Sequence, residues 1–239
     1  MDTNTPRLPM SYDELLASLQ QHADADKAAG MAAYMRDQFV YLGIPTPLRR
    51  KLGKPFIRQL SAKPGIDWAF IDACWQSPYR ELHYVALDYL SATRSRLMPS
   101  DIPRLKKLAI THPWWDTIDF LDRIIGDIAL RHPKVNKTLL AWSVDDNIWL
   151  RRIAIDHQLL RKEKTDTELL ARILCNNLGQ KEFFINKAIG WALRDYSKTN
   201  PDWVRDFIAR HRPQMASLSI REASKYLQVF NRSCSRLPT

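Results

Sequence analysis

The chain has 239 residues, of which 45% are hydrophobic and 26% are charged, a composition typical of a globular protein rather than a disordered one. Its 36 Lys and Arg outnumber its 26 Asp and Glu, and the formal net charge of +10 favours polyanionic partners. Only seven glycines are present, which argues against hairpins and phosphate-binding loops. Three scattered cysteines, with no signal-like or transmembrane segment, predict a cytoplasmic protein without a disulfide framework or membrane association.

Apolar residues recur three and four apart along most of the chain, which is the pattern of amphipathic helices, and no sustained alternation predicts a strand. Proline and polar breaks divide this pattern into about twelve helices of roughly 10 to 18 residues. In chain order the breaks fall at Pro45 and Pro47, Pro64, Pro78, Pro99 and Pro103, Pro113, Pro133, Asp145 to Asn147, Gly179, Pro201 and Pro213.

A spacing of 34 residues relates the helices that are richest in Ala and Ile. The positions on this spacing are Ala86, Phe120, Ala154, Ala188 and, one residue late, Ala223. Small or apolar residues at such positions allow close stacking of helices. The pattern predicts one all-α domain over residues 1–239, with its core at about 11–231, built as a curved solenoid of antiparallel helix pairs. A compact helical bundle is the alternative.

Positive charge is concentrated in the second half of the chain. Residues 1 to 119 carry 15 basic and 13 acidic side chains, whereas residues 120 to 239 carry 21 and 13. Basic and aromatic residues recur there at helical spacing: Arg151, Arg152, Lys187, Trp191, Arg194 and Lys198. Such side chains on one surface suit the phosphates and sugars of nucleic acid. Cations that extend past a buried tryptophan are the structural alternative.

The segment THPWWDTIDFLDRIIG contains the most distinctive carboxylate. Pro113 is predicted as the first helical residue, and Asp116 in the first turn then complements the helix dipole. Asp119 lies one turn deeper, on the same face as Trp115, and has no such local role. An ion pair is its structural alternative, which composition alone favours, and the candidate partners are Arg123, Arg151 and Arg152. The histidines and cysteines show no metal-ligand spacing, so no metal site is predicted.

At these residues the chain resembles the AlkD family of DNA alkylation-repair glycosylases, over about residues 12 to 230. The stretches that carry the resemblance are MAAYMRDQFVYLGIPTPLRRKL (31 to 52), RELHYVALDYL (80 to 90), WWDTIDFL (114 to 121), DNIWLRRIAIDHQL (146 to 159) and KEFFINKAIGWALRDYSKTNPDWV (181 to 204). The resemblance implies HEAT-like repeats with a concave DNA-binding face, excision of N3- and N7-alkylated purines without a deep base-flipping pocket, and no metal or cofactor.

The resemblance also implies roles for particular residues. Asp119, the second Asp of WWDxxD, resembles the catalytic carboxylate of the family, and Trp115 resembles the aromatic residue beside it. Trp191 and Tyr34 are similar to further aromatic residues that line the site. Arg152 is the preferred DNA-contacting arginine, with Arg151 as the alternative. The remaining candidates for DNA binding are Lys187, Arg194 and Lys198.

The expected function is therefore that of a monofunctional DNA glycosylase that acts as a monomer on double-stranded DNA. It would hydrolyse the N-glycosidic bond of cationic purines such as 3-methyladenine and 7-methylguanine. An ionised Asp119 would stabilise the oxocarbenium ion and position the attacking water. The alternatives are a noncatalytic relative that binds damaged or branched DNA, and a helical-repeat scaffold for other proteins.

Overall fold

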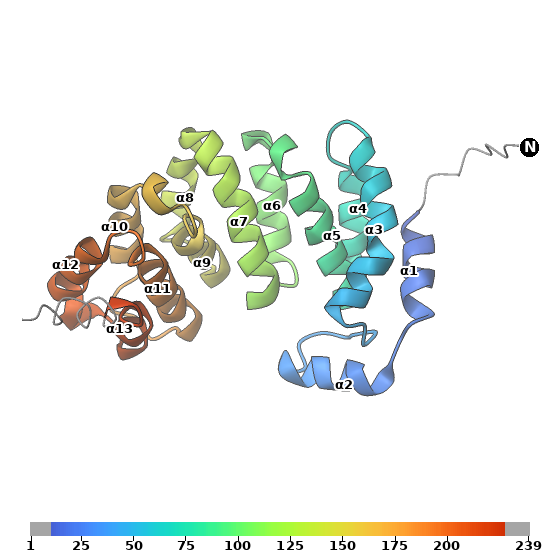
Figure 1. Cartoon of the computed structure of the whole chain (residues 1–239), viewed down its shortest axis with the longest axis horizontal. Coiled ribbons are helices and arrows are strands. Elements are labelled where there is room, and N and C mark those ends of the chain that lie inside the picture. Colours follow the sequence, from blue (N-terminus) through green and yellow to red (C-terminus); the bar gives the residue numbers. More distant parts are fainter. Residues whose placement is uncertain (1–10, 228–239) are drawn as a thin grey trace, which may run out of the picture. The chain divides into compact units, whose positions relative to one another are not determined.

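A computed structural model of the chain describes residues 11–227. In this range the protein consists of thirteen α-helices and short 3₁₀ turns, with an isolated β-bridge between Val40 and Tyr79 and no β-strand, so the all-α prediction is confirmed (Figure 1). None of the helices in this range combines the length and apolar character needed to cross a membrane. Residues 228–231, the end of the predicted core, and the termini predicted to be peripheral lie outside the described residues.

The chain forms two compact units that divide after Leu97. The helices of the first unit are α1 (Tyr12–Gln20), α2 (Ala25–Tyr34), α3 (Thr46–Ala62), α4 (Trp68–Gln76) and α5 (Arg80–Ala92). Side-chain caps start several of them, among them Ser11, whose hydroxyl accepts from the backbone N–H of Glu14. The prediction of one domain over the whole chain stays a prediction.

In the first unit, α2 has no buried residue of its own. The segment that follows it is held by the buried carboxylate of Glu81, which accepts hydrogen bonds from the backbone N–H groups of Leu42, Gly43 and Ile44. Three bonds to one charged acceptor fix the path of the chain after α2 more firmly than neutral bonds would. The helix is therefore positioned by its flanking segment and not by a core-facing stripe.

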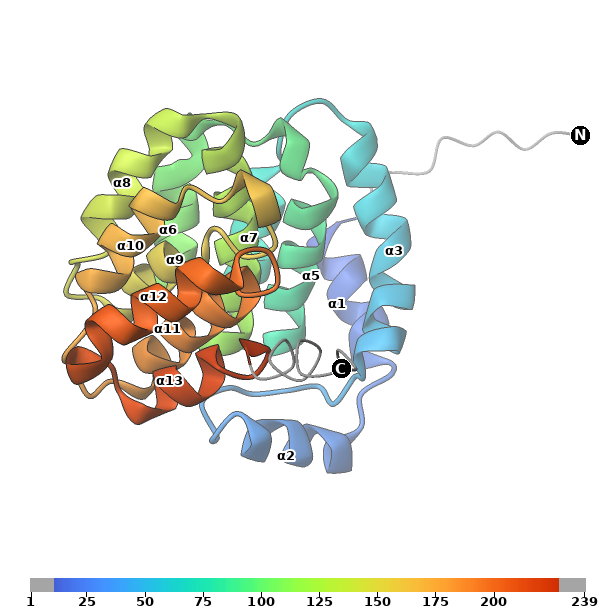
Figure 2. The ribbon, with the colours of Figure 1, turned by 60° about the vertical axis from the view of Figure 1, so that its left-hand side comes forward.

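The helices of the second unit are α6 (Ile102–Ile110), α7 (Trp115–Arg131), α8 (Asn136–Trp142), α9 (Ile148–Asp156), α10 (Thr167–Cys175), α11 (Phe183–Tyr196), α12 (Pro201–His211) and α13 (Ser217–Ala223). Successive odd-numbered helices pack on one another, α7 on α9, α9 on α11 and α11 on α13. The even-numbered helices α8 and α10 lie side by side and both contact α9 (Figure 2). The unit thus stacks helix pairs, as the 34-residue spacing predicts.

The core of the second unit lies between these stacked helices. Ile118 and Leu121 of α7, Ile153 and Ala154 of α9, and Ala188 of α11 are all fully buried. Ala154 and Ala188 occupy the small-residue positions of the repeat, where a larger side chain would hold neighbouring helices apart. The stacking leaves one face of α7, α9 and α11 to carry polar side chains.

Candidate active site

An aromatic cluster joins the beginnings of α7, α9 and α11. The ring centroids of Trp114, Trp149 and Phe184 lie 5.0 to 5.7 Å apart, in tilted or edge-to-face contacts. Trp114 has an extended backbone (φ −159°, ψ 162°) and precedes α7. The prediction that Pro113 is the first helical residue is therefore wrong: the helix begins at Trp115, because Trp114 stays extended with its ring in the cluster.

The carboxylate of Asp119 is the central feature of the polar face. Its Oδ1 accepts two hydrogen bonds from Arg152, from Nε at 3.0 Å and from Nη2 at 2.8 Å. The third nitrogen of the same guanidinium, Nη1, donates to the backbone carbonyl of Phe184 at 2.8 Å. Within residues 11–227 no hydrogen bond reaches Oδ2 of Asp119, whose side chain is 21% exposed. The ion pair with Arg152, the structural alternative for Asp119, is thus present.

The two arginines of α9 have different environments. The side chain of Arg152 is only 1% exposed, because it faces both α7 and α11. Its guanidinium is engaged by Asp119 and Phe184, so the structure does not present it to a phosphate. Arg151 is the more exposed of the two and forms no ion pair among residues 11–227. Of the two sequence candidates for DNA contact, Arg151 is therefore the accessible one.

Cations gather around Trp191 of α11, which is half-buried. The guanidinium carbons of Arg152 and Arg194 lie 5.2 and 5.7 Å from the centre of its ring, and Nζ of Lys187 lies 5.6 Å away. Such cation–π contacts are favourable and leave the outer charges near solvent. The predicted residues Asp119, Arg152, Lys187, Trp191 and Arg194 are therefore brought together.

Glu222 of α13 anchors the cations at the edge of this group. Its carboxylate accepts hydrogen bonds from Arg194 at 2.7 Å and from Lys225 at 2.8 Å, and it lies 3.9 Å from Nζ of Lys187. Burial raises the pKa of Glu222, but these cations outweigh burial and the net pKa is lowered. The α13 helix approaches closely because residue 190 is a glycine: an added Cβ would lie 2.5 Å from the Cβ of Glu222.

The other predicted residues lie around or away from this group. Trp115 begins α7, one turn before Asp119. Lys198 is half-exposed, with Nζ 3.7 Å from Asp195 and over the ring of Tyr226. Tyr34 ends α2 in the first unit and is 72% exposed. It is the one predicted site residue outside the second unit.

Two further carboxylates lie behind Asp119. Oxygen atoms of Asp119, Asp122 and Asp156 are all within 4.8 Å of one another, and Arg152 lies among them. Burial, reinforced by the charges of Asp156 and Asp119, raises the pKa of Asp122 well above its ordinary value. Burial also raises the pKa of Asp156 to about 7, against the opposing charge of Arg152. The guanidinium of Arg152 supplies positive charge to two of these carboxylates, Asp119 and Asp156.

The pKa of Asp119 is also raised, by burial, although Arg152 lowers it in opposition. Burial lowers the pKa of Arg152, but Asp156 and Asp119 more than offset this, so the guanidinium stays charged. Asp119 thus sits at the outer edge of a group of three carboxylates and one guanidinium, and it alone of the three carboxylates has solvent access.

Sequence reasoning missed Asp122, Asp156 and Glu222. Asp156 follows Arg152 by four residues, which is the spacing of an ordinary surface ion pair, and Asp122 lies three residues after Asp119 without an oppositely charged neighbour at that spacing. The repeat offers a signal, since Asp122 and Asp156 are 34 residues apart and occupy equivalent positions in α7 and α9. No such signal marks Glu222.

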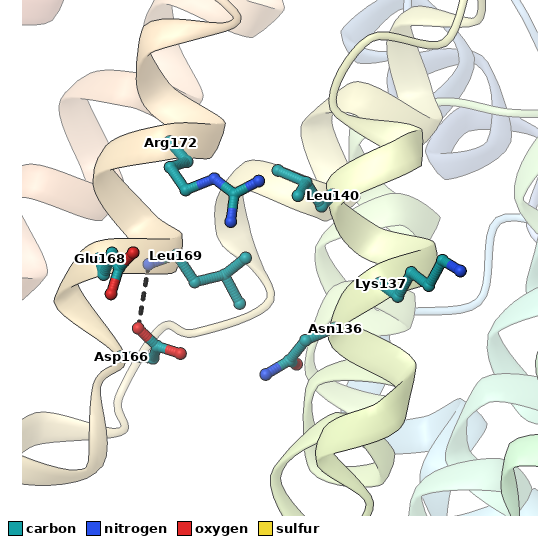
Figure 3. Close-up of a pocket in the computed structure, with 7 residues that line it drawn as sticks. All are labelled: Asn136, Lys137, Leu140, Asp166, Glu168, Leu169 and Arg172. Carbon is teal, nitrogen blue, oxygen red and sulfur yellow. Dashed lines mark hydrogen bonds between the residues drawn. The ribbon is translucent and has the colours of Figure 1, made fainter.

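A cavity of about 380 Å³ lies elsewhere in the second unit, between α8 and α10 (Figure 3). Lys137 of α8 and Arg172 of α10 line it together with Glu168 and with Asp166, whose carboxylate accepts from the backbone N–H of Leu169. Both charge signs are present, and none of the predicted site residues contributes. This cavity is therefore separate from the polar face around Asp119.

Comparison with known proteins places the chain in a family. Residues 15–227 match the family described as DNA alkylation repair enzyme, so the chain belongs to that family. A search of curated proteins gave no match.

Two solved structures are similar to this chain. One is a predicted DNA alkylation repair enzyme from Enterococcus faecalis, with 36% identity and a TM-score of 0.80 over 86% of this chain and 96% of that one. The other is the alkylpurine DNA glycosylase AlkC of Pseudomonas fluorescens, bound to DNA containing an abasic site analogue. It shares 17% identity and a TM-score of 0.50 over 88% of this chain and 64% of that one. The family expected from the sequence is thus confirmed, and AlkC supports the helical fold.

Replacing Arg152 with Met tests its role as the counter-ion of the buried carboxylates. We expect the free energy of unfolding to fall by about 3 to 5 kcal/mol at pH 8, because buried carboxylates lose their cation. The loss should be smaller at pH 5, where carboxyl groups with raised pKa values take up protons in the folded variant. Urea unfolding at both pH values measures this, with Arg151→Met as the matched control. Equal, small losses at both pH values would refute the role.

Proposed function

We propose that the protein is a DNA glycosylase that removes cationic N3- and N7-alkylated purines, and that Asp119 is its catalytic carboxylate. The observation that carries the proposal is the partly exposed carboxylate of Asp119, bonded through Oδ1 to Arg152 and with Oδ2 open on the polar face. Membership of the DNA alkylation repair family supports the reaction class.

Hydrolysis of this N-glycosidic bond needs only modest catalysis. In a 3-methyladenine or 7-methylguanine nucleotide the base already carries a positive charge, so it can leave without a strong general acid. The bond between C1′ and the ring nitrogen breaks with its electron pair going to the base, which becomes neutral, and the sugar becomes an oxocarbenium ion. Water then attacks C1′ and loses a proton, which leaves an abasic site.

Asp119 stabilises the positive charge that grows on the sugar and orients the attacking water. At about 4 Å and an effective dielectric constant of ~20, two opposite unit charges attract by ~4 kcal/mol, or about a thousandfold in rate. The indole rings of Trp115 and Trp191 would stabilise the positive charge on the sugar by cation–π interactions, worth ~0.5 to 2 kcal/mol each. Such modest terms suit a bond that is already labile, and they need no deep pocket around the base.

The proposed phosphate contacts beside Trp191 are Lys187 and Arg194, because the guanidinium of Arg152 is engaged within the protein. Glu222 balances only one of the three charges of Lys187, Arg194 and Lys225, so this edge keeps a net positive charge beside the reacting sugar. We also propose Arg151 and Lys198 as phosphate contacts and, separately, Tyr34 of the first unit as an aromatic contact to DNA. Because α7, α9, α11 and α13 of one chain supply the site of the second unit, we propose that the protein acts as a monomer. We also propose that it acts in the cytoplasm.

Replacing Asp119 with Asn removes the charge with almost no change of shape. We expect single-turnover release of 7-methylguanine from methylated duplex DNA to fall by about a hundredfold to a thousandfold, while DNA affinity is retained. Asp127→Asn is the matched control, because it removes one negative charge from an exposed pair on the same helix. Release at the wild-type rate by Asp119→Asn would contradict the mechanism. DNA binding without base release by the wild-type protein would favour a noncatalytic relative.

Replacing Lys187 with Ala tests the phosphate-binding edge. If Lys187 contacts a phosphate, the slope of log K against log salt concentration should become shallower by about 1, equally for damaged and undamaged duplexes. Fluorescence anisotropy at several salt concentrations measures the slope, with exposed Lys134 replaced by Ala as the control. A wild-type affinity that hardly depends on salt would instead point to a scaffold for proteins.

A further inference from the structure

Among residues 11–227 the buried carboxylate of Asp156 forms an ion pair with Arg152 alone. Nη2 of Arg152 lies 3.8 Å from Oδ2 of Asp156 and 2.8 Å from Oδ1 of Asp119, so one nitrogen faces both carboxylates. The side chain of Asp156 is 0% exposed, and neither of its oxygens accepts a hydrogen bond within residues 11–227. A buried carboxylate with so few partners costs stability, so a role other than stability is needed to explain it.

The charges around Arg152 can be counted. On α7 the groups that face Asp156 are Asp119, Asp122 and Arg123, and on α11 the group is Asp195. Asp122 is fully buried, and burial together with the charges of Asp156 and Asp119 raises its pKa well above the ordinary value. The carboxylates that form ion pairs with the guanidinium of Arg152 are those of Asp119 and Asp156, and these three side chains make up the innermost group. Its net charge is −1 when Asp156 is ionised and zero when Asp156 is protonated.

This difference matters for a cationic substrate. If Asp119 and Arg152 were alone, their opposite charges would largely cancel at the sugar, and little field would remain to stabilise an oxocarbenium ion. A second negative charge behind the guanidinium restores that field without occupying the space that the DNA must enter. Nη1 and Nε of Arg152 are held by Phe184 and Asp119, which keeps the guanidinium between the two carboxylates.

We propose that Asp156 is a positioning residue that balances the charge of Arg152, so that the charge of Asp119 stays available to the reacting sugar. This inference rests on the proposed function and deepens it. Base release is then fast when Asp156 is ionised and slow when it is protonated, so the rate rises with pH through the neutral range, near the pKa of Asp156.

The test replaces Asp156 with Asn and follows single-turnover release of 7-methylguanine between pH 5.5 and 8.5. Removing a unit charge at roughly 8 to 10 Å, at an effective dielectric constant of ~20, slows a reaction by about tenfold to thirtyfold. We expect that loss at pH 8, no rise in rate through the neutral range, and unchanged affinity for DNA. The variant should then match the wild-type rate at pH 5.5. Asp127→Asn, which makes the same change in net charge at the surface, should keep the wild-type profile.

A second measurement needs no reaction. In ¹³C-labelled protein, the carboxyl carbon of Asp156 can be titrated by NMR, and in Asp119→Asn its midpoint should move to lower pH, because the like charge of Asp119 has been removed. A wild-type rate profile in Asp156→Asn, together with an Asp156 midpoint that does not move in Asp119→Asn, overturns the proposal, while the function proposed for Asp119 stands. Absence of base release by the wild-type protein rejects that function instead, and the NMR titration still tests the coupling.

Discussion

The second unit depends on one interaction, the double hydrogen bond from Arg152 to Oδ1 of Asp119. A guanidinium that is only 1% exposed has to be satisfied from within the protein, and here Asp119 of α7 and the carbonyl of Phe184 in α11 do so. The same bonds connect three helices of the stack. They also orient Asp119 so that its second oxygen remains open. Stability and the candidate chemistry therefore use the same atoms.

The surrounding structure serves this arrangement. The aromatic cluster of Trp114, Trp149 and Phe184 fixes where α7, α9 and α11 begin, and hence where the turns that carry Asp119 and Arg152 lie. Because Gly190 has no side chain, α13 packs close to α11, and Glu222 can then accept a hydrogen bond from Arg194. Negative charge at Asp119 of α7 and net positive charge around Trp191 of α11 thus lie on different helices of the stack. Such a pattern suits a duplex whose backbone is anionic and whose damaged base is cationic.

Much of this could be read from the sequence. The helical period, the proline breaks and the 34-residue spacing predicted the stacked helices, and WWDxxD indicated Asp119. The burial of Arg152 could not be predicted from the sequence, because Arg151 and Arg152 are adjacent on one helix and differ only in the direction they face. That direction depends on how α9 packs between α7 and α11. Asp156 was not predicted for a related reason. Its spacing from Arg152 is that of a solvated surface ion pair, and it is buried only because neighbouring helices pack over it. The start of α7 was misplaced because the ring of Trp114 packs in a cluster assembled from distant segments.

The proposed mechanism uses an ionised carboxylate and no strong general acid, so the protein should act only where the leaving base is already cationic. The most direct test compares single-turnover release of 7-methylguanine with that of hypoxanthine, an uncharged damaged purine, from otherwise identical duplexes at pH 7.5. We expect release of 7-methylguanine well above the spontaneous rate and no acceleration for hypoxanthine. Comparable acceleration of both would show that the protein protonates its leaving group, and would refute the proposed mechanism.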